Sequence, residues 1–288
     1  MLAYINWDVS PIFITLGPLE IRWYGLMFAL GFLAGYWIVA RMFKHEGAPE
    51  KWLGTLLIFL VVCTVVGARL GHVFFYEWDY YSQHKGEIFK IWEGGLASHG
   101  GAIANFIGLC IFSWCVAKKN PSWTIDKVVV PIALVAGLIR LGNLFNSEIY
   151  GDPTDLPWGF VFVRNGETFA SHPTQLYEAL AYFALFGLLM WMYWKRNAEE
   201  RPWLLTGVFF LWTFGARFII EYVKNPQESW ESDMALNMGQ WLSIPFILLG
   251  AGLMIYAMCR PRQEWKFPGK FAEELEGPGK SKSKPTKK

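Results

Sequence analysis

The sequence predicts an all-α polytopic membrane protein with about seven membrane-spanning helices. Hydrophobic residues make up 53% of the 288 residues and charged residues only 17%, whereas soluble domains usually carry about a quarter charged residues. The charges are gathered into short clusters, and the apolar stretches between them are long enough to cross a bilayer core of about 30 Å. Lys and Arg are also distributed unequally between alternate connecting segments.

The apolar stretches give the seven spans in order along the chain. We expect them at residues 24–43, 52–76, 96–117, 128–145, 175–194, 203–222 and 238–259. Residues 1–260 would thus form one membrane domain, with an outer loop or small outer region at about 147–174, the longest connection. Residues 11–18 belong to a segment without the pattern of a cleaved signal peptide, so we expect them to stay attached as an interfacial arm.

The basic residues predict the orientation. Seven spans place the termini on opposite sides, and most Lys and Arg outside the spans fall on the side of the C-terminal tail. Because short cytoplasmic loops retain positive charge, the N-terminus is expected outside and the C-terminus in the cytoplasm. The lysine-rich tail, residues 261–288, is expected to be disordered and able to touch anionic membrane lipids.

Several function classes are disfavoured. The formal net charge is +2, but no span offers a basic stripe for a phosphate backbone, so we expect no nucleic acid partner. His and Cys residues do not recur at ligand spacing, so we expect no metal and no other cofactor. Ser98 beside His99 is not a serine-protease dyad, since adjacent helical residues point in different directions.

Polar residues inside the spans gather in the predicted outer half of the membrane. A charged side chain near the bilayer centre costs a few kcal/mol on insertion scales, so such groups often mark a pathway or a site. The residues concerned are Tyr24, Arg69, His99, Arg140, Asn143, Arg217 and Glu221.

Some of these residues have an equally good structural interpretation. Arg69 lies between two glycines and could be a snorkelling or helix-packing residue. Arg217 and Glu221 form an i,i+4 pair that could simply neutralise itself. For His99, hydrogen-bonded packing is the alternative to a role in proton transfer.

Arg140 carries the strongest functional signal. Asn143 and Asn146 follow it at three-residue steps and Glu148 closes the run, so hydrogen-bonding groups converge on one helix end. Two arginines near the lipid interface suit an anionic head group, phosphate or carboxylate, whose acyl chains stay in lipid. A nearby histidine could move a proton. The residues alone therefore indicate a lipid-phosphate site.

A series of motifs follows in order along almost the whole chain except the tail. The strongest is RLGNLFNSEIYG at residues 140–151, and the others are RWYGL (22–26), GARLG (67–71), WEGGLASHGG (92–101), HPTQLYE (172–178), RFIIE (217–221) and GQWLSIP (239–245). In this order the motifs resemble those of the bacterial prolipoprotein diacylglyceryl transferases. The first matches that family's signature of arginine, glycine, two asparagines, glutamate and glycine.

The resemblance implies an enzyme of the bacterial inner membrane with its active site toward the outer leaflet. It would transfer the diacylglyceryl group of phosphatidylglycerol to the lipobox cysteine of preprolipoprotein signal peptides, releasing glycerol phosphate. Arg140 and Arg217 would bind the lipid phosphate, and His99 would be the base, with Glu148 or Glu221 as alternatives. The implied catalytic residues are His99, Arg217 and Glu148. The implied substrate-binding residues are Arg140, Tyr24, Asn143, Asn146, Gly151 and Glu221.

One departure and two alternative functions accompany this interpretation. The family often has a tyrosine shortly before the arginine of the sixth span, where this sequence has Thr213 or Phe214 and therefore no phenol. A transporter or channel for an anionic substrate would need polar residues through the full membrane depth, whereas the inner halves of the spans are nearly free of charge. A structural subunit would leave the ordered motifs unexplained.

Overall fold

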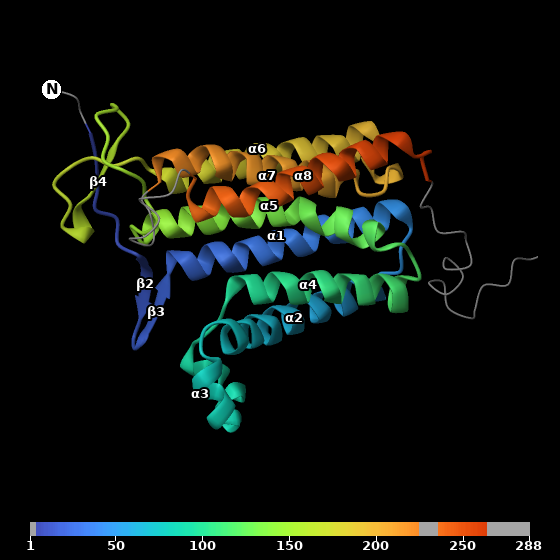
Figure 1. Cartoon of the computed structure of the whole chain (residues 1–288), viewed down its shortest axis with the longest axis horizontal. Helices are drawn as coiled ribbons and strands as arrows, with labels where there is room; N and C mark the ends of the chain where they lie inside the picture. Colours follow the sequence, from blue (N-terminus) through green and yellow to red (C-terminus); the bar gives the residue numbers. More distant parts are fainter. Residues whose placement is uncertain (1–3, 225–235, 264–288) are drawn as a thin grey trace, which may run out of the picture. The chain divides into compact units, whose positions relative to one another are not determined.

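The computed structural model describes residues 4–224 and 236–263, and seven of the helices in these ranges are long and apolar enough to cross a membrane. The predicted polytopic all-α fold is thereby confirmed. The helices are α1 (Trp23–Glu46), α2 (Lys51–Phe75), α4 (Ser98–Ile111) with a π-helical continuation (Phe112–Ala117), α5 (Pro121–Phe145), α6 (Thr174–Arg196), α7 (Leu204–Ile220) and α8 (Met238–Cys259) (Figure 1).

The start of α5 is the one predicted boundary that is clearly wrong. The helix begins at Pro121 and not near residue 128, because proline is well suited to the first turn of a helix. The polar residues that hydropathy assigns to a loop belong to this helix, and their side chains are buried in the protein. Among them, Asp126 accepts hydrogen bonds from the backbone N–H groups of Trp203 at 2.7 Å and Thr206 at 2.8 Å, and so caps the start of α7.

The described chain divides into two compact units. The first contains residues 4–37, 126–224 and 236–263, and the second contains residues 38–125. The predicted disordered tail at 261–288 lies outside the described residues from 264 onward.

In the first unit, α5, α6, α7 and α8 run side by side (Figure 1). Small residues allow α7 and α8 to approach closely: a Cβ atom at Gly250 would lie 2.6 Å from the backbone nitrogen of Leu211. The start of α8 is fixed by a capping box, in which Asn237 and Gln240 each accept a hydrogen bond from the other's backbone N–H.

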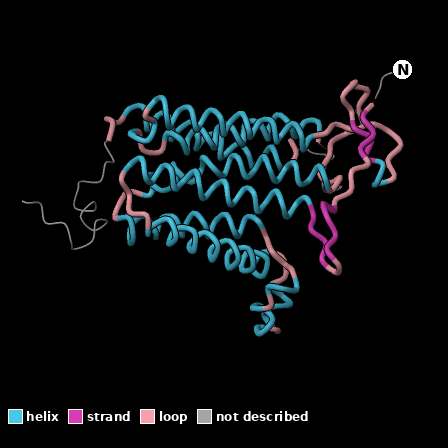
Figure 2. The backbone as a smooth tube through the Cα atoms, turned by 180° about the vertical axis from the view of Figure 1, so that it is seen from behind, coloured by secondary structure: helices cyan, strands magenta, loops and turns pink. Residues whose placement is uncertain are grey.

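Two small sheets lie beyond one end of these helices (Figure 2). Strand β1 (Ile5–Trp7) pairs in parallel with β4 (Phe160–Phe162), and β2 (Ile12–Leu16) pairs antiparallel with β3 (Leu19–Arg22). The predicted interfacial arm at 11–18 thus lies largely in a hairpin that leads directly into α1. Strands this short carry too few residues to show a clear alternation of polar and apolar side chains.

The segment between α5 and α6 has a small hydrophobic core of its own. Phe160 and Phe162 pack with Leu144 of α5, and Trp7 and Tyr150 pack against this cluster. The Tyr150 hydroxyl in this segment donates to Glu167 at 2.7 Å, and this bond raises the pKa of the phenol. The connection is therefore an ordered structure that covers the end of α5.

The second unit contains α2, α4 and the short helix α3 (Trp78–Gln83), followed by two 3-10 turns (Lys85–Phe89 and Ile91–Glu93). Glycines let α2 and α4 pack backbone to backbone, since a Cβ atom at Gly71 would lie 2.6 Å from the Cα atom of Gly100. Asn105 of α4 also donates to the Thr64 hydroxyl of α2 at 2.8 Å.

Arg69 has a structural role in this unit. Its side chain is buried, with the residue only 3% exposed. It donates to the carbonyl oxygens of Glu87 at 2.7 Å, Ile88 at 2.8 Å, Gly94 at 2.7 Å and Gly95 at 3.3 Å. Of the two interpretations that the sequence left open for Arg69, these contacts favour the structural one, because the guanidinium group fastens the connection between α3 and α4 to α2.

Candidate functional site

The end of α5 joins four of the predicted site residues in one hydrogen-bond network. Arg140 Nη1 donates to Asn143 Oδ1 at 3.3 Å, and Asn143 Nδ2 donates to Glu148 Oε1 at 2.7 Å. Asn146 Nδ2 donates to the same Glu148 oxygen at 3.2 Å. The three-residue steps of the motif thus bring these side chains together, as the sequence indicated.

The backbone that carries Glu148 is strained. Ser147 and Ile149 both have left-handed conformations, with φ of 56° and 61°. A β-branched residue such as Ile149 rarely adopts this conformation, and each such residue costs about 1–3 kcal/mol. The two residues reverse the chain after α5, and this reversal lets the Glu148 carboxylate face the asparagines of the preceding helix.

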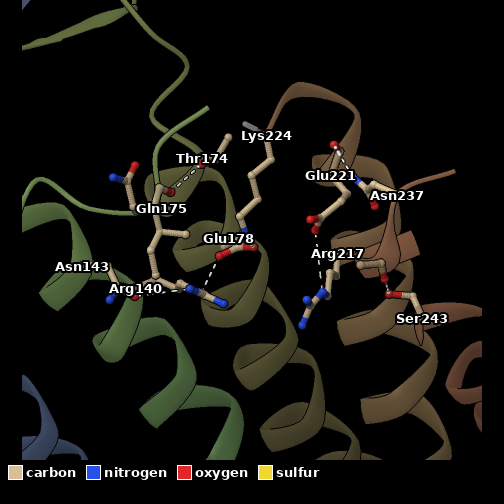
Figure 3. Close-up of polar contacts among 12 residues, drawn as sticks. Arg140, Asn143, Thr174, Gln175, Glu178, Arg217, Glu221, Lys224, Asn237 and Ser243 are labelled. Atoms are coloured by element: carbon tan, nitrogen blue, oxygen red, sulfur yellow. Dashed lines mark hydrogen bonds and ion pairs between the residues drawn. The ribbon is translucent and has the colours of Figure 1, made fainter. Parts of the chain in front are cut away.

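Glu178 of α6 is the central acid of the site, and sequence reasoning missed it. It is 2% exposed, it forms an ion pair with Arg140, and its Oε1 lies 3.5 Å from Lys224 Nζ (Figure 3). The sequence did contain a signal, because Glu178 is the only acidic residue of an apolar span. Lys224, which lies between two apolar spans in the sequence, also has a buried side chain.

A second ion pair, Arg217 with Glu221, faces this cluster in Figure 3. The Arg217 Nε atom lies 3.7 Å from Glu221 Oε2, which is too long for a hydrogen bond. Both atoms are buried and have no hydrogen-bond partner within the described ranges. Since buried polar groups are nearly always hydrogen-bonded in native proteins, this pair can accept a ligand group.

Lys224 relates the two ion-pair clusters to each other, because it pairs with Glu178 of the first cluster. Lys224 directly follows the 3-10 turn (Glu221–Val223) that begins with the acid partner of Arg217. The two arginines therefore belong to one polar region at the end of the α5–α8 helices.

Tyr24 and Gly151 were also predicted as substrate-binding residues. The Tyr24 ring lies against α5, where a Cβ atom at Gly142 would be 2.9 Å from Tyr24 Cδ2. Gly151 donates its N–H to the His172 carbonyl at 2.8 Å, and a Cβ atom there would lie 2.7 Å from Thr174 Cγ2. Glycine is thus needed for close packing, and direct binding of substrate by either residue stays a prediction.

His99 belongs to the second unit, whereas the other eight predicted site residues belong to the first. It lies in the first turn of α4 and is exposed. Its ring is 5.3 Å from that of Phe75 and 5.6 Å from that of Tyr76, measured between centroids. Its assignment as the base stays a prediction.

The fold and the first unit's polar region define a class of protein. Seven apolar helices make this a multi-pass membrane protein, and the arginines at one end of α5 and α7 form a candidate site for an anionic group. Within residues 4–224 and 236–263, no group of three or more His, Cys, Asp or Glu side chains could hold a metal ion.

Comparison with known proteins gives the family. The model of the prolipoprotein diacylglyceryl transferase family matches residues 11–256. A Porphyromonas gingivalis protein named phosphatidylglycerol–prolipoprotein diacylglyceryl transferase is 49% identical over 273 residues, covering 90% of this chain and 96% of the relative. Relatives with the same name occur in Chloroherpeton thalassium (46% over 261 residues, 91% and 97% covered) and Tolumonas auensis (46% over 253 residues, 86% and 96% covered). The chain therefore belongs to this transferase family, which confirms the predicted resemblance.

Close packing of Gly239 against Glu221 gives a test of the site's construction. A Cβ atom at Gly239 would lie 2.5 Å from the Glu221 carboxyl carbon, so we expect Gly239→Ala to displace the carboxylate and to leave the protein less stable than Gly252→Ala does. Gly252→Ala in the same helix is the matched control, because its Cβ would meet nothing within 4 Å. Thermal unfolding in detergent measures both, and equal midpoints would contradict the packing described.

Proposed function

We propose that this chain transfers the diacylglyceryl group of phosphatidylglycerol to the lipobox cysteine of preprolipoproteins. The cysteine sulfur forms a thioether bond to the glycerol carbon, and the carbon–oxygen bond to the phosphate breaks. The oxygen leaves with the electron pair as glycerol phosphate, and the thiol proton passes to a base. The family membership supports this reaction, and the incompletely hydrogen-bonded Arg217 beside the Arg140 cluster is the structural observation that carries it.

The two arginines bind the lipid phosphate in this proposal. Arg140 is oriented by Glu178 and Asn143, yet a guanidinium group has five N–H donors. Arg217 has a longer ion pair and is the more available of the two. Donors already fixed in an apolar environment stabilise the charge that develops on the leaving phosphate without having to reorganise.

The base must remove the thiol proton, because the thiolate is the nucleophile and a free thiol is mostly protonated at neutral pH. His99 is our candidate, since it is exposed and histidine is the side chain that most often serves as a general base. Glu148 and Glu221 are the alternatives. Tyr24, Asn143, Asn146 and Glu148 order the site by hydrogen bonding in this proposal.

The site faces the outer leaflet of the bacterial inner membrane in this proposal, with the N-terminus outside and the C-terminus in the cytoplasm. The polar region lies at the end of α5 and the start of α6, whereas Lys195 and Arg196 are the last residues of α6, and Lys118 and Lys119 lie just before the start of α5. The positive-inside tendency places those lysines and arginines in the cytoplasm.

The reaction itself is the first test. The purified protein in phosphatidylglycerol micelles, incubated with a lipobox peptide, should give a peptide whose mass increases by one diacylglyceryl group. A matched peptide with Ser in place of the cysteine should give no adduct. Absence of the adduct from a folded preparation would refute the proposed function.

Arg140 and Arg217 should each be required for transfer. Loss of one preorganised charged donor typically costs about 10²–10³-fold in rate, so we expect Arg140→Ala and Arg217→Ala to show at least that loss in the mass assay. Arg217→Lys keeps the charge but not the planar fork, and should recover only part of the rate. Wild-type rates for either Ala variant would remove that arginine from the site.

His99 can be tested as base against hydrogen-bonding residue. An amide cannot take up a proton at neutral pH, so we expect His99→Asn and His99→Gln both to lower kcat by about 10²–10⁴-fold if His99 is the base. Faster transfer at higher pH, as the peptide thiol ionises without help, should partly restore the rate. Near-wild-type rates in both variants would pass the role of base to Glu148 or Glu221.

A further inference from the structure

The strained turn after α5, residues 147–149, is fastened by three side chains that the proposed reaction does not use. Its three successive carbonyl groups each accept a hydrogen bond from a different side-chain donor. The pairs are Asn165 Nδ2 to Ser147 O at 2.7 Å, Gln175 Nε2 to Glu148 O at 2.6 Å, and Thr174 Oγ1 to Ile149 O at 2.9 Å. We call Asn165, Thr174 and Gln175 the clamp residues.

Two of the clamp residues come from a rigid element. Thr174 and Gln175 are fully buried and form the first turn of α6. Glu178, which orients Arg140, follows Thr174 by four residues and so lies on the same helix face. One helix end therefore contacts both the arginine and the turn that carries Glu148.

The turn needs such fastening. Its first and third residues, Ser147 and Ile149, are left-handed, and a β-branched side chain disfavours this conformation. A strained conformation persists only where the surrounding structure determines it several times over. Backbone hydrogen bonds from the N–H groups of Ser147 to Leu144 and of Glu148 to Asn143 fix the near side of the turn, and the clamp residues fix its carbonyl side.

We propose that the clamp residues are positioning residues, which hold the strained turn so that the Glu148 carboxylate stays on Asn143 and Asn146. This rests on the proposed function for its catalytic consequence. The donors of the three clamp residues are directed to the backbone of the turn, which is the contact expected of positioning residues. Since Asn143 also accepts from Arg140, the fastened turn sets the orientation of the network, whereas the Glu178 ion pair anchors Arg140 separately.

A matched pair at Thr174 tests the proposal in the full-length protein. Thr174→Val keeps the shape and removes the hydroxyl donor, and Thr174→Ser keeps the donor. We expect Thr174→Val to lower kcat about tenfold, because small displacements of catalytic groups are costly, with KM for phosphatidylglycerol unchanged. Thr174→Ser should stay within about twofold of the wild type in both constants.

Hydrogen exchange of the peptide covering residues 143–151 gives a readout that does not depend on activity. Losing one hydrogen bond should speed the exchange of the Ser147 and Glu148 amides by up to about tenfold in Thr174→Val, with no change in Thr174→Ser. Equal exchange in the two variants would overturn the proposal. A raised KM with unchanged kcat would also overturn it, because Thr174 would then be a substrate contact.

Ile149→Gly completes the design as a double-mutant cycle. Glycine adopts a φ of about 60° without steric cost, so the turn no longer depends on the clamp to resist strain. We therefore expect Thr174→Val to have a smaller effect on exchange in the Ile149→Gly background than alone, whereas purely additive effects would contradict the coupling. A wild-type protein without transferase activity but with these exchange results would refute the proposed function and leave the positioning role intact.

Discussion

The burial of the Glu178 carboxylate is the constraint on which the site depends. A charge removed from water inside apolar helices is strongly destabilising unless it is paired, and Glu178 is paired with Arg140 on α5 and with Lys224 beyond α7. Three separate parts of the chain are thus required to meet at one carboxylate. This meeting fixes the position of Arg140 and packs Gly151 against the segment before Lys224. It also holds the turn after α5 close to the first turn of α6.

The two arginines show how one polar region can combine rigidity with readiness to bind. Arg140 is held by a carboxylate and an asparagine, so its orientation is set before any ligand arrives. Arg217 has a carboxylate at 3.7 Å and a buried nitrogen without a hydrogen bond in the described chain. A preorganised group such as Arg140 reduces the free-energy cost of ordering the site on binding. The Arg217 nitrogen without a hydrogen bond in the described residues contributes most to the binding free energy, because a phosphate oxygen would accept its hydrogen bond.

Hydropathy predicted the spans because a membrane helix satisfies its own backbone hydrogen bonds. The length and composition of a segment are therefore enough to identify it as a spanning helix. The same reasoning failed at Pro121, where Asp126 is buried as the cap of another helix and does not belong to a loop. Spacing along α5 predicted the network of local partners around Arg140. It could not find Glu178 or Lys224 as partners, because their ion pairs join residues far apart in the sequence.

The pairing of β1 with β4 has a consequence for the order of biosynthesis. The two strands are separated by about 150 residues and by four of the apolar helices, an even number, so both emerge on the same face of the membrane. Strand β1 is synthesised before these four helices, and it stays unpaired until α5 has been inserted and β4 has followed it. During synthesis its open edge is exposed to proteases and to wrong partners, so the cover over the end of α5 is among the late parts of the protein to form.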